Sequence, residues 1–214
     1  MKKSIATLAA AMFCCGLLAG PAAAATYSLT YSGPLTIAED GYFHYADIVD
    51  FSLAGAITDV NVMVDIEHYW PEDLDIYLAH SLTGEKGTWK YVQLYNQEQG
   101  GAIQENLNVL FNDQATTSIT DAAPPYGLGS YQPTSNPESG RSNLLTDYNG
   151  DLAAGIWSLV LFDNASPDIG TLQSFRVDID TAGVPQTAVP LPGAVVFLGS
   201  GLGALVGVRR SRQK

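Results

Sequence analysis

Basic residues are scarce in this chain, which has 10 Lys and Arg against 22 Asp and Glu. Six of the ten basic residues stand at the two ends, and all 22 acidic residues lie between Glu39 and Asp180. Residues 26–188 therefore carry a net charge of −18. A nucleic-acid binder needs clustered Lys and Arg to neutralise phosphates, so this class is excluded. Cations or cationic surfaces are the electrostatic partners that this charge favours.

Cysteine is nearly absent, and both cysteines, Cys14 and Cys15, fall in an N-terminal segment that has the three parts of a secretory signal. A Lys2-Lys3 start precedes an apolar run over residues 5–18, and Ala23-Ala24-Ala25 precedes Thr26. The pattern predicts a signal peptide over residues 1–25. The exported chain then has no disulfide and no thiolate chemistry. The run is short for a membrane anchor, which needs about 20 residues.

Long helical patterns are missing between residues 26 and 188, and short alternating segments bounded by Gly, Pro, Asn and Asp take their place. Alternation over residues 59–67, 73–78 and 172–179 predicts half-buried strands. Residues 156–162 are apolar enough for a central strand that is covered on both faces. Residues 114–144 predict long loops with short strands. The composition thus indicates one all-β domain.

The C-terminal end carries a second targeting pattern. Sixteen uncharged residues, 193–208, separate a Pro-containing motif from a basic end. The motif is Val189, Pro190, Leu191 and Pro192, and the basic end begins with Arg209 and Arg210. This order resembles the PEP-CTERM sorting signal of the Val-Pro-Leu-Pro type. The resemblance implies processing by an exosortase, transient inner-membrane insertion of a short helix, and export to the cell surface or extracellular matrix of a Gram-negative bacterium. A plain membrane anchor is the alternative.

Segments between about Leu35 and Asp180 resemble, in their order, the P domain, also called the P/Homo B domain, of subtilisin-like proprotein convertases. The segments that carry the resemblance are residues 57–68, 73–78, 111–115, 125–133, 150–163 and 168–172. The resemblance implies a jelly-roll β-sandwich, galactose-binding-domain-like, that serves as a binding or stabilising module. Residues 79–86 and Phe175 depart from the family's pattern. The expected organisation is a signal peptide (1–25), an N-terminal segment (26–34), the sandwich (35–180), a linker (181–188) and the sorting signal (189–214).

No catalytic domain fits beside this module, and no motif pairs a nucleophile with a base. His68 is expected to be a packed or turn-capping residue, and His44 to lie on a surface or edge strand. His80 is expected to begin a polar loop. The chain is therefore not expected to be an enzyme.

The acidic residues are the best candidates for a ligand-binding site in this sequence. If residues 59–67 and 73–78 pair as a hairpin, Glu67 lies near Asp73 and Asp65 lies near Asp75. Hard oxygen ligands of this kind suit calcium; a solvated acidic face is the alternative, and the simpler explanation. A second candidate for calcium is the turn between Asp163 and Asp168, whose side chains could also bond only their own backbone.

Aromatic residues give a further hypothesis, because Trp70, Trp89, Tyr91 and Tyr95 flank loops near the expected hairpin. Exposed rings would stack on the apolar faces of sugars. The sequence thus predicts an exported cell-surface binding or structural module, with an exopolysaccharide as a candidate partner. The alternative is an accessory domain that stabilises or recruits a separate subtilisin-like serine protease.

Overall fold

The alternating segments fold into strands whose side chains alternate between the interior and the surface. The structure, a computed structural model, describes residues 24–38, 41–96, 106–122, 126, 128–165 and 168–183. In strand β3 (Ala56–Glu67), Val60, Val62, Val64 and Ile66 are buried while the residues between them are more exposed. The helical turns of the described residues are short 3₁₀ segments: η1 (Pro71–Asp73), η2 (Ile119–Asp121) and η3 (Leu145–Tyr148). The all-β prediction is confirmed for the described chain.

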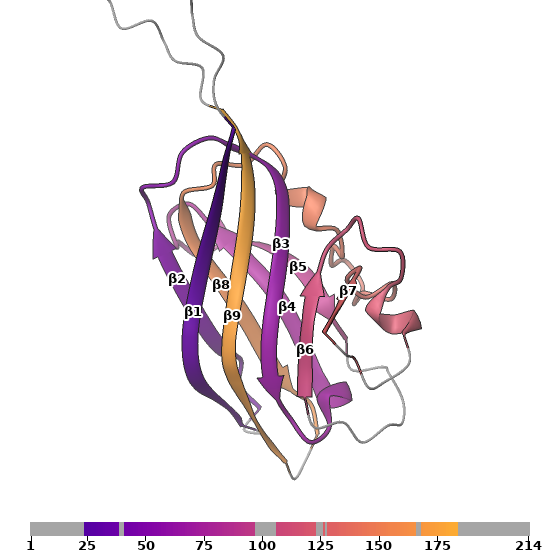
Figure 1. Ribbon diagram of the computed structural model, residues 1–214. Coiled ribbons are helices and arrows are strands. Elements are labelled where there is room, and N and C mark those ends of the chain that lie inside the picture. Colours follow the sequence, from indigo (N-terminus) through magenta and orange to yellow (C-terminus); the bar gives the residue numbers. More distant parts are fainter. Residues whose placement is uncertain are drawn as a thin grey trace, which may run out of the picture. The chain divides into compact units, whose positions relative to one another are not determined.

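Two sheets pack face to face, one in front of the other in Figure 1. Sheet A has the order β1 (Ala25–Ala38), β9 (Ile169–Ala182), β3, β6 (Asn106–Phe111) and β7 (Gly129–Tyr131). Sheet B has the order β2 (His44–Asp50), β8 (Gly155–Asp163), β4 (Leu74–Ser81) and β5 (Lys90–Tyr95). Neighbouring strands are antiparallel except β6 and β7. The predicted β-sandwich is therefore confirmed.

The core lies between the inner faces of the two sheets. Its largest fully buried side chains are Trp157, Tyr95, Tyr148, Phe111 and Phe175. Two of these have buried polar atoms with partners, since Trp157 Nε1 donates to the Ala153 carbonyl at 3.0 Å and the Tyr148 hydroxyl donates to the Leu78 carbonyl at 2.7 Å. Burial of apolar area drives the packing, and these bonds remove the cost of burying polar groups.

The strand predicted at residues 156–162 is central, as expected. It corresponds to β8, which lies between β2 and β4 in sheet B. Trp157, Leu159 and Leu161 point into the core, whereas Ser158 and Val160, on the other face, are 1% and 4% exposed. A second set of side chains therefore covers the outer face of this strand.

The predicted hairpin between residues 59–67 and 73–78 is wrong. Strand β3 pairs with β6 and β9 in sheet A, whereas β4 pairs with β5 and β8 in sheet B. The connection that begins at His68 passes from one sheet to the other at the lower end of Figure 1. The inner face of β3 is apolar, and that of β4 is apolar apart from His80, so the crossing lets these two faces meet in the core. A flat hairpin would place them side by side on one surface.

Strand β1 pairs with β9 from Ala25–Thr181 to Ala38–Ile169. Residues 26–34, expected to precede the sandwich, thus form much of its edge strand. In the predicted loop region 114–144, the described residues contain η2 and the short strand β7. The described residues contain no helix that is long and apolar enough to span a bilayer. Apart from Ala24 and Ala25, the signal peptide lies outside the described residues, as do residues 184–188 of the expected linker and the whole sorting signal. The first two residues of the expected linker, 181 and 182, instead end β9.

Candidate functional site

One end of the sandwich gathers carboxylates around a buried histidine. His68 follows β3, Asp163 ends β8, and Asp168 precedes β9. The His68 Nε2 atom lies 3.2 Å from Asp163 Oδ2, and its Nδ1 atom lies 3.2 Å from Asp168 Oδ2. The side chains of His68 and Asp163 are fully buried, and that of Asp168 is 13% exposed. One imidazole therefore bridges two carboxylates.

The backbone around His68 holds its ring in place. The Trp70 N–H lies 3.1 Å from His68 Nδ1 and 3.2 Å from Asp168 Oδ2, so it can donate to either. A Cβ atom added at Gly170 would overlap His68 Cδ2, so only glycine lets β9 approach the ring this closely. The expectation of a packed, turn-capping histidine at position 68 is confirmed.

Negative charge is costly at this end of the sandwich. Burial raises the pKa of Asp163, although the hydrogen bond from the Ala165 N–H and the contact with His68 oppose the change. Burial also raises the pKa of Asp73, with further contributions from the charges of Asp168 and Asp163. Burial likewise raises the pKa of Glu72, whose Oε1 atom is buried without a hydrogen-bond partner. Burial of these carboxyl groups therefore disfavours their charged forms.

The remaining predicted ligands lie apart from this cluster. Asp75 is buried on β4, where its Oδ2 accepts from Asn164 Nδ2 at 2.8 Å. Asp65 stands on the outer face of sheet A opposite Asn108 and Ser174, and Glu67 is exposed at the end of β3. Asp65 and Asp75 therefore belong to different sheets. Within the described ranges no group of three or more His, Cys, Asp or Glu side chains is arranged to hold a metal ion. Calcium binding stays a prediction.

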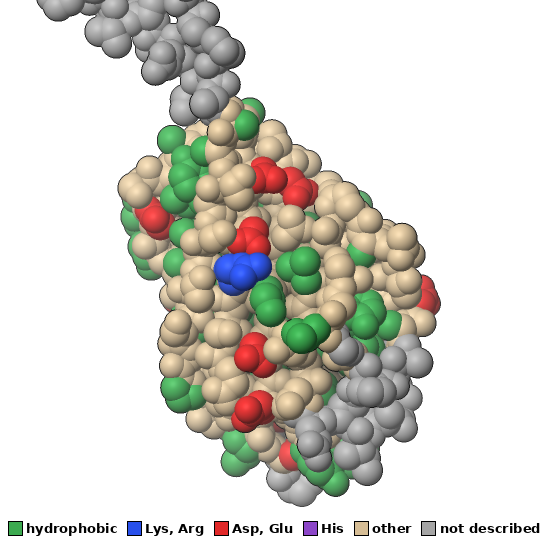
Figure 2. All heavy atoms as spheres, in the orientation of Figure 1, with side chains coloured by type: hydrophobic (Ala, Val, Ile, Leu, Met, Phe, Trp, Pro, Cys, Tyr) green, Lys and Arg blue, Asp and Glu red, His purple; other side chains and the backbone are tan. Residues whose placement is uncertain are grey.

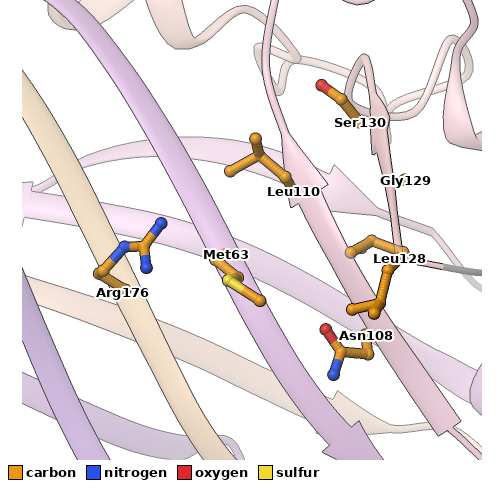
Figure 3. Close-up of a pocket in the computed structure, with 8 residues that line it drawn as sticks. Met63, Asn108, Leu110, Leu128, Gly129, Ser130 and Arg176 are labelled. Carbon is orange, nitrogen blue, oxygen red and sulfur yellow. The ribbon is translucent and has the colours of Figure 1, made fainter.

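The outer face of sheet A is acidic and carries a shallow hollow. Figure 2 shows this face, with red acidic side chains around a blue basic group and green apolar side chains beside it. The hollow is about 300 Å³ and is lined by apolar side chains together with Asn108 and Ser130, from β3, β6, β7 and the residue before β7, with Arg176 at one side (Figure 3). The Arg176 guanidinium is paired with Asp178, at 2.9 Å from Nη2 and 3.0 Å from Nε. The charge of Arg176 is therefore already balanced by Asp178.

The outer face of sheet B is aromatic. Two rows of cross-strand neighbours form its centre. The first row is Tyr45, Val160, Tyr77 and Gln93, and the second is Asp47, Ser158, Ala79 and Tyr91. Ala79 and Ser158 are small, so the larger side chains around them, with Trp89, leave a hollow of about 210 Å³. We call this the serine hollow.

A second hollow of about 180 Å³ adjoins the first and shares Tyr45, Tyr91 and Val160 with it. We call it the arginine hollow, because Arg141 lies 5.5 Å from the ring centroids of both Tyr77 and Tyr91. Aromatic rings attract a cation at this distance. Burial raises the pKa of both tyrosines, so their hydroxyl groups stay protonated at neutral pH.

The loop that carries Arg141 is tied to β5 on both sides of the arginine. The Glu138 N–H donates to Gln93 Oε1 at 2.7 Å, and the Gln93 N–H donates to the Ser142 carbonyl at 2.7 Å. Gln93 Nε2 in turn donates to the Tyr77 hydroxyl at 3.3 Å. The loop is thus held over the aromatic face by bonds to the sheet itself.

The Ser158 hydroxyl is the least satisfied polar group of this face. Its oxygen is buried and has no hydrogen-bond partner. An unpaired buried hydroxyl costs about 1–3 kcal/mol, so such groups are unusual in native proteins. Because Ser158 lines the serine hollow, a group bound there could supply the missing bond.

Comparison with known proteins gives no family. No family model and no curated protein matches the chain. Among solved structures, a serine protease of Aeromonas sobria is distantly similar, with a TM-score of 0.40, 15% identity, and coverage of 76% of this chain and 27% of that one. The structure of infectious bursal disease virus Gx strain has a TM-score of 0.34 and 12% identity over 86% of this chain and 38% of that one. The chain thus spans less than half of either. The resemblances to the P/Homo B domain and to the sorting signal stay predictions.

The sequence predicted some of the residues that line the two hollows on sheet B. Of the four aromatic residues named for ligand binding, Trp89 and Tyr91 line the serine hollow. Tyr95 is instead 1% exposed in the core, because a register shift in the pairing of β4 with β5 brings it opposite Ile76. Trp70 lies in the turn after His68. Arg141 and Ser158 were missed, and the only signal for Ser158 was a lone hydroxyl within an apolar run.

The other two histidines have structural positions. His44 begins β2, an edge strand of sheet B, as expected. His80 was expected to begin a loop, which is wrong, because it lies within β4. Its ring stacks on Trp157 at 4.2 Å, and its Nε2 lies 3.1 Å from the Ala154 carbonyl. Burial lowers the pKa of His80, so this ring stays neutral.

Proposed function

We propose that this chain is an exported cell-surface binding module, sorted by an exosortase, whose ligand contacts the aromatic outer face of sheet B. The observation that supports it most is the pair of adjoining hollows with the unpaired Ser158 hydroxyl. Ligand sites are typically concave and aromatic, with a few polar groups that fix orientation. The loop that carries Arg141 is anchored to β5, so this surface is formed before a ligand arrives.

The strand orders support a jelly-roll interpretation of the sandwich. The chain crosses between the sheets at every step except from β4 to β5 and from β6 to β7, so that the order β1, β9, β3, β6 faces the order β2, β8, β4, β5. This arrangement corresponds to two Greek keys folded over each other, the jelly-roll pattern. Jelly-roll sandwiches serve as binding modules in many proteins, and function must still be argued from the site.

Retention on isolated Gram-negative cell envelopes tests the proposal. We expect the purified protein to be retained and the variant Tyr45→Ala/Tyr91→Ala to be lost in the wash, because both rings border both hollows. Leu128→Ala is the matched control, since Leu128, which precedes β7 beside the hollow on sheet A, is 83% exposed. Equal retention of the double variant would overturn the proposal. If the protein instead captures a subtilisin-like protease from the envelopes, and the double variant captures it equally well, the accessory-domain alternative is favoured.

A further inference from the structure

The two hollows form one continuous site with complementary chemistry. Each is smaller than the roughly 300–1,000 Å³ of pockets that enclose drug-sized ligands. Each therefore has room for a single ring-sized group. Because the hollows share Tyr45, Tyr91 and Val160, they adjoin, and two neighbouring units of one ligand fit them side by side.

The polar groups of the serine hollow call for a ligand rich in hydroxyl groups. Asp47, which is exposed, presents a carboxylate that only accepts hydrogen bonds. Ser158, directly opposite Asp47 across the strand pair, needs a partner that donates or accepts. A sugar hydroxyl does both, and the C–H face of a pyranose ring covers an aromatic side chain. Resting on the proposed binding function of this surface, we infer that the hollows hold two adjacent units of an uncharged polysaccharide.

A quaternary ammonium group is the nearest competitor, because aromatic cages with a carboxylate bind such cations. It would leave the Ser158 hydroxyl unpaired, since it has no hydrogen-bonding group. Arg141 also already lies over the rings of Tyr77 and Tyr91, so a second cation beside it would be repelled.

An anionic polysaccharide is disfavoured by charge. Residues 26–188 have a net charge of −18, and Arg141 is the only basic residue that lines either hollow within the described chain. Its guanidinium lies 3.9 Å from Glu138. A polyanion would meet this single cation and many carboxylates. An uncharged chain avoids that repulsion and can still accept hydrogen bonds from Arg141.

Titration calorimetry of the purified protein tests the ligand class. The probes are gluco-, manno-, xylo- and galacto-oligosaccharides of one to six units, with alginate oligosaccharides as the anionic probe and choline as the cationic probe. We expect at least one uncharged series to bind, with an affinity that rises about tenfold or more from one unit to two, because the second unit binds intramolecularly. Preferential binding of alginate or choline would overturn the inference.

Two variants separate a specific site from general stickiness. Ser158→Ala should weaken binding about two- to tenfold, the value of one hydrogen bond, and should not lower the melting temperature, because the hydroxyl has no partner in the free protein. Tyr91→Ala should weaken it more. Tyr69→Ala is the aromatic control, since Tyr69 is 52% exposed and lines neither hollow. An unchanged affinity in Ser158→Ala would overturn the inference.

The failures of the two proposals have different signatures. If no oligosaccharide binds while envelope retention still depends on Tyr45 and Tyr91, the saccharide inference is wrong and the binding function stands. If retention does not depend on these rings, the binding function is wrong as well.

Discussion

Removing the His68 ring should leave the buried Asp163 carboxylate and the mostly buried Asp168 carboxylate without their shared partner, which sets the size of the effect. An unpaired buried polar group costs about 1–3 kcal/mol, and a buried charge that loses its partner costs about 3–5 kcal/mol. These two ranges meet at about 3 kcal/mol. We therefore expect His68→Leu to lower the free energy of unfolding by about 3 kcal/mol at pH 7. Domains of this kind have a total stability of about 5–15 kcal/mol, so the variant should fold but be visibly weakened.

Urea unfolding followed by tryptophan fluorescence measures this loss, because Trp70 lies in the same turn and Trp157 lies in the core. With a slope of about 2 kcal/mol per molar urea, the transition midpoint should fall by about 1.5 M. The matched variant is His68→Leu/Asp163→Asn, in which the amide keeps the size of Asp163 but has no charge to strand. Part of the lost stability should return, and the double-mutant cycle should give a coupling energy above about 1 kcal/mol.

The same cycle has a pH arm whose sign follows from the pKa of Asp163. That pKa is raised by burial and held down in part by His68, so removing His68 raises it further. A carboxyl group with a raised pKa in the folded state contributes stability at low pH that is lost as the pH rises through that pKa. The penalty of His68→Leu should therefore shrink between pH 7 and pH 4. If the two substitutions have additive effects on the free energy of unfolding, or if the penalty of His68→Leu is equal at pH 7 and pH 4, then His68 does not bridge the carboxylates.

Other predictions concern single positions. Asp73→Asn should raise the melting temperature at pH 7 and lose this advantage towards pH 4, because the pKa of Asp73 is raised. Asp50→Asn should lower the melting temperature at both pH 7 and pH 4 and lose this penalty only as the pH falls below the ordinary carboxyl value of 3.8, since the side-chain and backbone hydrogen bonds from Ser52 lower the pKa of Asp50; equal pH profiles of the two variants would contradict both. Gly170→Ala should cost about 1–3 kcal/mol through overlap with His68, and much less in a His68→Ala background; equal costs would exclude the overlap. Mass spectrometry of surface-extracted protein should find no peptide beyond Gly193, whereas an intact basic end would indicate a plain anchor.

Local alternation predicted the strands but could not predict which strands pair. Residues 59–67 and 73–78 have the right period for strands, and the short connection between them suggested a hairpin. The actual partners of β3 are β6 and β9, the second of which begins about a hundred residues later. Pairing at such a separation depends on which apolar faces meet in the core, and period alone contains no information on this.

The same limit explains which site residues were found. The turn from Asp163 to Asp168 is local, so its carboxylates were visible in the sequence. The bridge to His68 joins residues 95 positions apart, and Arg141 reaches its rings only because Gln93 anchors a distant loop. Trp89 and Tyr91 were found because they lie close together in the sequence beside a loop, at the start of β5, while their neighbours Tyr45 and Asp47 come from the opposite edge of sheet B.

Strand β8 takes part in three regions: the core, the carboxylate cluster around His68 and the serine hollow. Its inward side chains, such as Trp157, fill the core, its last residue Asp163 contacts His68, and its outward Ser158 lines the serine hollow. Asp163 lies five residues from Ser158, which at about 3.3 Å per residue is beyond the roughly 7–10 Å over which substitutions interact. Changes at the His68 end should therefore alter stability without altering ligand affinity. A folded His68→Leu protein that binds saccharide as tightly as the parent would show that the two regions act independently.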